Sequence, residues 1–187
     1  MTSKKLCEKS CTRRLVKFLS GENPRWTGYI KDGLMLYNGK NEPCIRKAPY
    51  QPGDILYVRE TWHKYIKRVG EGKSCHLAEF YGYKASIANS EDADEPWKPS
   101  IHMQKEAARI WIKVTNVRVE RLQEMWASDV PKEGIYFNKP TTADEMLMAF
   151  AKLWNSTIKK SDLDSYGWNA NPWVWVIEFE RCEKPET

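Results

Sequence analysis

Several features that define common classes of protein are scarce or missing in this sequence of 187 residues. No apolar run approaches the roughly 20 residues that a membrane-spanning helix needs, and the start, MTSKKLCEK, is polar where a signal peptide requires an apolar stretch. The five cysteines are scattered and form no CxxC pair, which argues against a disulfide framework or a zinc finger. We therefore expect a cytoplasmic protein with reduced thiols and no membrane partner.

Histidine is equally rare. His63, His76 and His102 are the three in the chain, and no HxH or HxxxH spacing brings two of them together. Catalytic metal sites commonly draw on such pairs. No metal is therefore expected, and no motif in the chain points to another cofactor.

Basic residues are concentrated at the start of the chain. The formal net charge is +5, but residues 1–50 contain 11 Lys or Arg against four Asp or Glu, so the remainder is slightly acidic. This asymmetry fits two interpretations equally well: a surface for a polyanion, or a feature that only promotes solubility. With 41% hydrophobic residues, the composition is that of a folded domain.

Periodic apolar residues predict several strands and few helices. Alternation predicts strands at 55–60, at 108–119 and at 173–182, the last with both faces of its first half buried. Turn signals in residues 20–43 predict a hairpin with strands at 26–30 and 34–37, and residues 65–89 indicate one further strand pair. Thr142 and Glu145 form a capping box ahead of an amphipathic helix, and SDVPKEGI predicts a short helix over 128–134. The pattern favours an α+β domain in which helices flank a small β-barrel.

The segment CEKSCTRR, residues 7–14, holds a lysine, a threonine and arginines close together. If the chain turns there from a helix into a strand, Lys9, Thr12 and Arg14 converge on one pocket, where arginine and lysine bind phosphate and a threonine hydroxyl serves as nucleophile beside a base. A solvated basic start to the chain explains the same residues.

CEKSCTRR also resembles the GxKxxExR signature of the ASCH family, a PUA-like β-barrel group, through its GRKTxTRR variant, with Cys7 at the glycine position. Three further segments, PGDILYVRETW, PSIHMQKEAARIWIKVTNVRVERLQ and NPWVWVIEFE, resemble ASCH proteins of phages and prophages. Family members usually carry an apolar strand before the motif, and MTSKKL has no equivalent. The resemblance implies one PUA-like mixed β-barrel domain over 1–187, with insertions near 19–48, 63–95 and 136–168.

The resemblance implies an RNA- or nucleotide-binding protein whose ligand lies against Lys9, Thr12, Arg13 and Arg14. One branch of the family hydrolyses acetylcytidine with a lysine base, a threonine nucleophile and a glutamate, which correspond here to Lys9, Thr12 and Glu133. An amidohydrolase acting on an acylated cytidine is thus the alternative. A third possibility is a non-catalytic accessory protein that sequesters a host nucleotide signal or partner.

Further candidate ligand contacts lie outside the motif. Arg59 and Glu60 follow the PGD turn and either face the same cavity or are ordinary surface residues. Trp62, Trp97 and His102 lie near charged or Pro-bounded segments, where they are candidates for stacking a base or gripping a phosphate.

Overall fold

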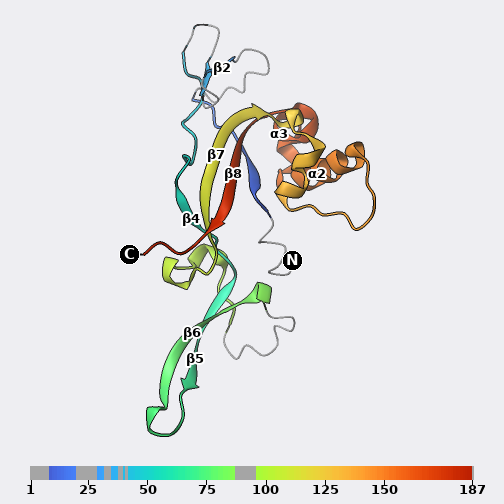
Figure 1. Cartoon of the computed structure of the whole chain (residues 1–187). Coiled ribbons are helices and arrows are strands. Elements are labelled where there is room, and N and C mark those ends of the chain that lie inside the picture. Colours follow the sequence, from blue (N-terminus) through green and yellow to red (C-terminus); the bar gives the residue numbers. More distant parts are fainter. Residues whose placement is uncertain are drawn as a thin grey trace. The chain divides into compact units, whose positions relative to one another are not determined.

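A curled antiparallel sheet that forms half a barrel is the main element of the structure, which is a computed structural model (Figure 1). The structure describes residues 9–19, 29–31, 35–37, 40, 42–86 and 96–186. The sheet has the strand order β1-β8-β7-β4, with β1 at Cys11–Leu15, β8 at Trp173–Cys182, β7 at Trp111–Arg121 and β4 at Ile55–Tyr57. The predicted α+β class is confirmed.

The chain divides into two compact units. Unit 1 is built around Ile55–Ile112 and the segment from Arg181 onward, and unit 2 comprises Glu8–Asp54 and Lys113–Glu180. Strands β7 and β8 begin in one unit and end in the other, because each crosses one of these boundaries. The expected single domain with insertions stays a prediction.

Strand β8 is the central strand of unit 2. Its first five residues are all buried, as the sequence predicts for a strand covered on both faces. Val174 and Val176 point to the same face as Cys11 of β1, since Leu15 pairs with Val174 and Arg13 with Val176. These residues enter the core cluster of unit 2.

Helix α2, Ala143–Thr157, covers that face of the sheet. Thr142 caps it as predicted, because its hydroxyl accepts from the Glu145 N–H at 3.3 Å while the Glu145 carboxylate accepts from the Thr142 N–H at 2.8 Å. The helix buries Phe150 and Trp154 in the core cluster. The short helix α3, Leu163–Tyr166, is joined to α2 by a hydrogen bond from Trp154 Nε1 to the Tyr166 carbonyl at 2.8 Å. Figure 1 shows α2 and α3 grouped together beside the sheet.

Unit 1 has its own core and a long hairpin. Strands β5, Trp62–Val69, and β6, His76–Tyr83, pair antiparallel over their whole length, which agrees with the strand pair expected here. The buried cluster contains Trp62, Met103, Ala107, Ala108 and Trp111. The tryptophans of this cluster are core residues and not a solvent-facing platform.

A smaller hairpin follows β1 in the chain. Strands β2, Tyr29–Lys31, and β3, Met35–Tyr37, pair antiparallel where the turn signals predict a hairpin. Trp26, expected in its first strand, lies outside the described residues.

Three predicted elements differ from the structure. Strand β4 ends at Tyr57, short of the predicted residue 60. Strand β7 begins at Trp111 and not near residue 108, because Lys105–Ala107 forms a 3₁₀ turn. The helix expected over 128–134 is instead a pair of 3₁₀ turns, Ala127–Asp129 and Pro131–Glu133. Proline lacks a backbone N–H and so begins the second turn without continuing a helix. Among the described residues, no helix is long and apolar enough to cross a membrane.

Candidate functional site

Strand β1 carries the motif, and its side chains divide between two faces because successive residues of a strand point in opposite directions. Cys11 and Arg13 are buried on one face, with exposed fractions of 2% and 5%. Thr12 is half-buried and Arg14 exposed on the other face. The motif residues therefore belong to two different environments.

The Arg13 guanidinium binds three carboxylates. Its Nη2 donates to Glu120 Oε1 at 2.9 Å and to Asp129 Oδ2 at 3.3 Å. Its Nη1 donates to Glu133 Oε1 at 3.0 Å. The Arg13 side chain is only 1% exposed, and a charge buried this deeply is stable only when it is paired. Arg13, expected among the ligand contacts, here joins β1 to β7 and to both 3₁₀ turns.

Further ion pairs extend this cluster toward the surface. Lys9 Nζ lies 3.2 Å from Glu133 Oε2, and Lys132 Nζ lies 2.8 Å from Asp129 Oδ1. Arg118 bridges the other oxygen of Glu120, at 3.0 Å, and Glu178, at 2.6 Å. We call this set the Arg13 network: Lys9, Arg13, Arg118, Lys132, Glu120, Asp129, Glu133 and Glu178. Its four cations and four carboxylates balance in charge.

The backbone holds Lys9 beside Glu133. The Ser10 N–H donates to the Lys132 carbonyl at 3.0 Å, which fixes the chain just before β1 against the second 3₁₀ turn. That turn ends at Gly134, whose φ of 87° lies in the left-handed region that glycine adopts without strain. Glu133 is consequently 7% exposed, although a glutamate at the end of a helical turn is usually solvated.

The structure brings together two members of the expected catalytic set. Lys9 and Glu133 form an ion pair. Glu133 is hydrogen-bonded to Arg13, and Thr12 projects from the opposite face of β1. Among the hydrogen bonds of the described residues, none joins the Thr12 hydroxyl to Lys9 or Glu133. Thr12 lies opposite Ile177 of β8.

Burial and neighbouring charges shift several pKa values in the network. Burial, together with the charge of Glu133, raises the pKa of Cys11 to about 12, so this cysteine stays a thiol and is a poor nucleophile. Burial alone would raise the pKa of Asp129, but the hydrogen bond and charge of Lys132, with Arg13, hold it below its usual value. Arg118 lowers the pKa of Glu178 against the same effect of burial.

A cavity of about 570 Å³ opens on the other side of β1. We call it the basic pocket, and its lining contains four cations and no carboxylate. Tyr50 at its rim is 37% exposed, and Trp175 is buried at 3%. The lining residues are Arg14, Leu15, Lys17, Arg46, Lys47, Pro49, Tyr50 and Trp175.

Backbone pairing assembles the basic pocket from three segments of the chain. Phe18 and Ile45 form an isolated antiparallel bridge. The Arg46 N–H donates to the Lys17 carbonyl at 2.9 Å. Strand β8 positions Arg14, because Arg14 lies directly opposite Trp175 in the register of β1 and β8. Cations that lie about 30 residues apart in the sequence therefore line one cavity.

The remaining candidates belong to unit 1. Arg59 is exposed and donates to the Ile101 carbonyl at 3.2 Å and to the Tyr57 hydroxyl at 3.1 Å. Glu60 is buried and accepts two hydrogen bonds from Arg109, at 2.7 and 2.8 Å. Glu60 thus has a structural partner, while Arg59 stays on the surface.

The three aromatic candidates in unit 1, Trp62, Trp97 and His102, differ in exposure. Trp62 is buried at 4%, with Lys98 Nζ 5.2 Å from its ring centroid. Trp97 is half-buried and its ring lies 4.6 Å from that of His63. His102 is exposed at the end of a 3₁₀ turn. Trp62 is therefore a core residue, whereas Trp97 and His102 keep exposed surface that a ligand can contact.

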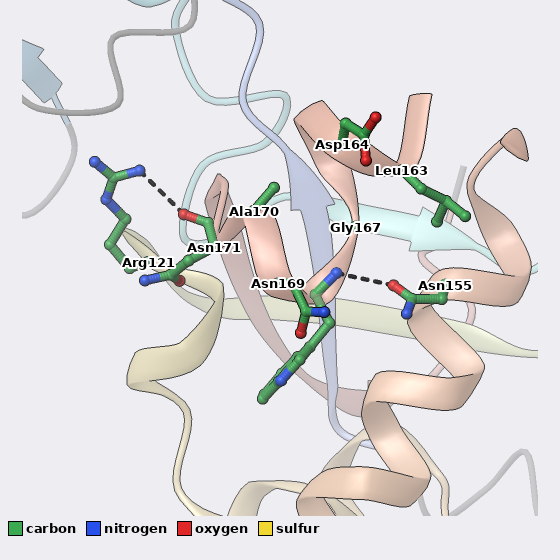
Figure 2. A pocket seen from close by; sticks show the side chains of 9 residues that line it. Arg121, Asn155, Leu163, Asp164, Gly167, Asn169, Ala170 and Asn171 are labelled. Atoms are coloured by element: carbon green, nitrogen blue, oxygen red, sulfur yellow. Dashed lines mark hydrogen bonds between the residues drawn. The ribbon is translucent and has the colours of Figure 1, made fainter. Parts of the chain in front are cut away.

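A second cavity, of about 600 Å³, lies between α2 and the segment after α3 (Figure 2). Its wall is fixed by the Asn155 side chain, which accepts from the Trp168 N–H at 2.8 Å. On the other side Arg121 donates to the Asn171 carbonyl at 3.0 Å. Three asparagine side chains line this cavity, so it is polar without a strong charge of one sign.

The sequence did not single out most partners of Arg13 or most of the basic pocket. Glu120 and Arg118 alternate with buried valines in VRVER of β7, and this charged face of an apolar strand is the signal that could have identified them. Arg46 and Lys47 carry no such signal. Within the part of the chain that the structure describes, no group of His, Cys, Asp or Glu side chains is suited to hold a metal ion.

Comparison with known proteins adds no relative. No family model matches this chain, and no curated protein or solved structure matches it either. The resemblance to the ASCH family therefore rests on CEKSCTRR and the three further segments of the sequence alone.

We predict that Arg13→Met lowers the free energy of unfolding by about 3–5 kcal/mol, because it leaves three carboxylates buried without their common partner. Urea denaturation of the purified protein measures this change. Arg14→Met, one residue along on the exposed face of β1, is the matched control and is expected to change stability by less than about 0.5 kcal/mol. Equal effects of the two substitutions would contradict the structural role of Arg13.

The network also predicts how stability depends on pH. Asp129 and Glu178 have lowered pKa values in the folded protein, so the unfolded chain binds more protons than the folded one in acid. Their contribution to the free energy of unfolding is complete above their usual pKa values of 3.8 and 4.5. It is lost as the pH falls through the lower pKa values of the folded protein. Urea midpoints measured between neutral pH and acid are expected to drop in this range. In an Asp129→Asn, Glu178→Gln variant the pH dependence should be shallower, and an unchanged profile would refute the assignment.

Proposed function

We propose that this chain is a PUA-like domain of the ASCH type that binds RNA or a nucleotide, with phosphate groups held in the basic pocket of unit 2. The observation that carries the proposal is the convergence of four cations, without a carboxylate, on one cavity of about 570 Å³. That volume suits a ligand of nucleotide size. Phosphate is the ligand that such a charge distribution favours.

Arg14 links the pocket to the motif. It is the second arginine of CEKSCTRR, and it lines the basic pocket on the face of β1 that Thr12 shares. A guanidinium binds phosphate through two parallel N–H donors, whereas the ammonium groups of Lys17 and Lys47 act as mobile point charges. Arg14 therefore suits an orienting contact, and the lysines add to affinity.

Tyr50 gives the pocket a second kind of contact. Its ring is partly exposed at the rim, beside Pro49 and the cations. Aromatic rings next to basic side chains stack nucleobases while the cations hold the backbone. A nucleotide with both a phosphate and a base thus uses the pocket more fully than inorganic phosphate does.

The proposal predicts salt-sensitive RNA binding that depends on the pocket cations. Arg46→Ala with Lys47→Ala should weaken binding of a fluorescein-labelled single-stranded RNA at least about tenfold, because charge-assisted contacts to phosphate are lost. Each lost phosphate contact should also reduce the slope of log affinity against log salt by roughly 0.7. Fluorescence anisotropy at a series of salt concentrations measures both quantities.

Lys152→Ala with Lys159→Ala is the matched control, because both lysines are exposed and line no part of the pocket. It removes the same two positive charges and is expected to leave the affinity and the slope nearly unchanged. Absence of RNA and nucleotide binding by the wild type at low salt, or an equal loss in the control, would reject the pocket as the binding site.

The second candidate is an amidohydrolase that deacylates an acylated cytidine, and it is favoured by the ion pair between Lys9 and Glu133 at 3.2 Å. In that reaction the proton shared by the pair lies on Glu133. The neutral Lys9 amine takes the hydroxyl proton as Thr12 attacks the acyl carbon, and the Glu133 carboxylic acid protonates the leaving amine. Water then cleaves the acyl-threonine ester and releases the acid. The reaction requires Thr12 to approach both partners.

Hydrolysis of acetylcytidine, followed by chromatography, tests this candidate. If the protein is this enzyme, Thr12→Val should abolish turnover by about 100-fold or more without changing stability, because Thr12 is not part of the Arg13 network. Lys9→Ala should have a similar effect on turnover, and Lys152→Ala should have none. Absence of turnover by wild-type protein that still binds RNA would reject the enzyme and retain the binding protein.

A further inference from the structure

The hairpin of β5 and β6 has two different faces. Because residues that pair directly across an antiparallel ladder share a face, the register places His63, Tyr65 and Lys67 on the same face as Phe80 of β6. The opposite face carries Lys64, Ile66 and Arg68, which pair with Tyr81, Glu79 and Leu77 of β6 in that order. An isolated two-stranded ribbon is only marginally stable in water. Contacts of its faces with other parts of the molecule or with a ligand therefore stabilise it.

Four aromatic rings form a continuous row on the first face, which we call the aromatic row: Trp97, His63, Tyr65 and Phe80. The rings of Trp97 and His63 have centroids 4.6 Å apart, and those of His63 and Tyr65 are near-parallel at 5.3 Å. Tyr65 and Phe80 continue the row at 5.8 Å with an interplanar angle of 26°. The row runs from a buried His63, 6% exposed, to Phe80, which is 36% exposed.

The inner end of the row is held rigidly. A Cβ at position 82 would overlap the His63 ring, so glycine at this point of β6 is what lets the imidazole lie across the strand. Trp97 is fixed by its neighbour Lys98, which exchanges two backbone hydrogen bonds with Trp62, at 2.7 and 3.1 Å. An aromatic surface that is ordered in advance loses little entropy when a ring of a ligand stacks on it.

Polar atoms without partners accompany these rings. Among the described residues, His63 Nδ1 and Trp97 Nε1 are buried and form no hydrogen bond. Such groups are costly unless a ligand or a solvent molecule meets them. Because both atoms are shielded from solvent, they belong to the packed inner end of the row, and contact with a ligand falls to the exposed end at Phe80.

Charge on the hairpin favours an anionic ligand. In β5 and β6 the single carboxylate is Glu79, which lies on the opposite face and is paired with Lys64 at 2.6 Å. The face of the aromatic row therefore carries no carboxylate from these strands, and it carries the exposed Lys67. Arg68 adds a positive charge on the opposite face, and at the tip Lys73 is balanced by Glu71.

We infer that the aromatic row is a contact surface for single-stranded nucleic acid, whose bases stack on Tyr65 and Phe80 while Lys67 contacts a phosphate. This surface lies within unit 1 and is separate from the basic pocket, which belongs to unit 2. The inference rests on ring geometry and on charge, and it does not require the pocket to bind.

Binding of two labelled oligomers of equal length, an oligouridine and an abasic chain with the same phosphates, tests the inference on the full-length protein. Anisotropy should show tighter binding of the oligouridine, because only it has bases to stack. Tyr65→Leu and Phe80→Leu keep apolar side chains but remove the rings. Each should weaken oligouridine binding about 5- to 100-fold and leave binding of the abasic chain unchanged.

Ile66→Ala with Leu77→Ala is the matched control, since both residues are exposed on the opposite face. It should not alter either affinity, and circular dichroism verifies that each variant folds. Equal binding of the two oligomers by the wild type, or an equal loss in the control, would overturn the inference. Analytical sedimentation provides a further test. The inference would also be overturned if the wild type is a dimer and Phe80→Leu converts it to a monomer without changing its affinity for RNA. Failure of the pocket proposal is distinguishable, because Arg46→Ala with Lys47→Ala affects both oligomers alike.

Discussion

A buried arginine with three carboxylate partners is the interaction on which unit 2 depends. Arg13 contributes the one guanidinium that reaches Glu120 of β7 and the carboxylates of both 3₁₀ turns. A salt bridge of this kind gives little net stability compared with an apolar core, but removal of one member leaves the others charged and buried. The network therefore acts mainly by allowing a single arrangement of β1, β7 and the turns.

This constraint also determines what the other face of β1 does. Because the strand alternates, fixing Cys11 and Arg13 inward turns Thr12 and Arg14 away from the network. Arg14 then joins cations from a distant segment in the basic pocket, where there is no carboxylate to neutralise them. Adjacent arginines in the sequence thus have opposite roles, one balanced within the protein and one open to an anionic ligand.

Local features were predictable from the sequence, and long-range ones were not. The capping box of α2 and the doubly buried first half of β8 depend on neighbouring residues, and both are confirmed. The partners of Arg13 lie 107 to 120 residues away, so no local pattern indicates which of two adjacent arginines is buried. Arg46 and Lys47 reach the pocket only through the bridge of Phe18 and Ile45, which no periodicity reveals. The family resemblance placed Lys9 and Glu133 in one site, and they form an ion pair. That Thr12 points away from Arg13 became evident only once residues 11–15 were seen to form a strand.

A double-mutant cycle between Arg13 and Glu133 tests the central claim most directly. Unfolding free energies of Arg13→Met, Glu133→Gln and the double variant, obtained by urea denaturation, give the coupling between the two side chains. The account predicts a coupling of about 1–3 kcal/mol, because removing Arg13 matters less once the Glu133 carboxylate is gone. Effects that add to within about 0.5 kcal/mol would show that the two residues act independently, and would contradict a network organised around Arg13.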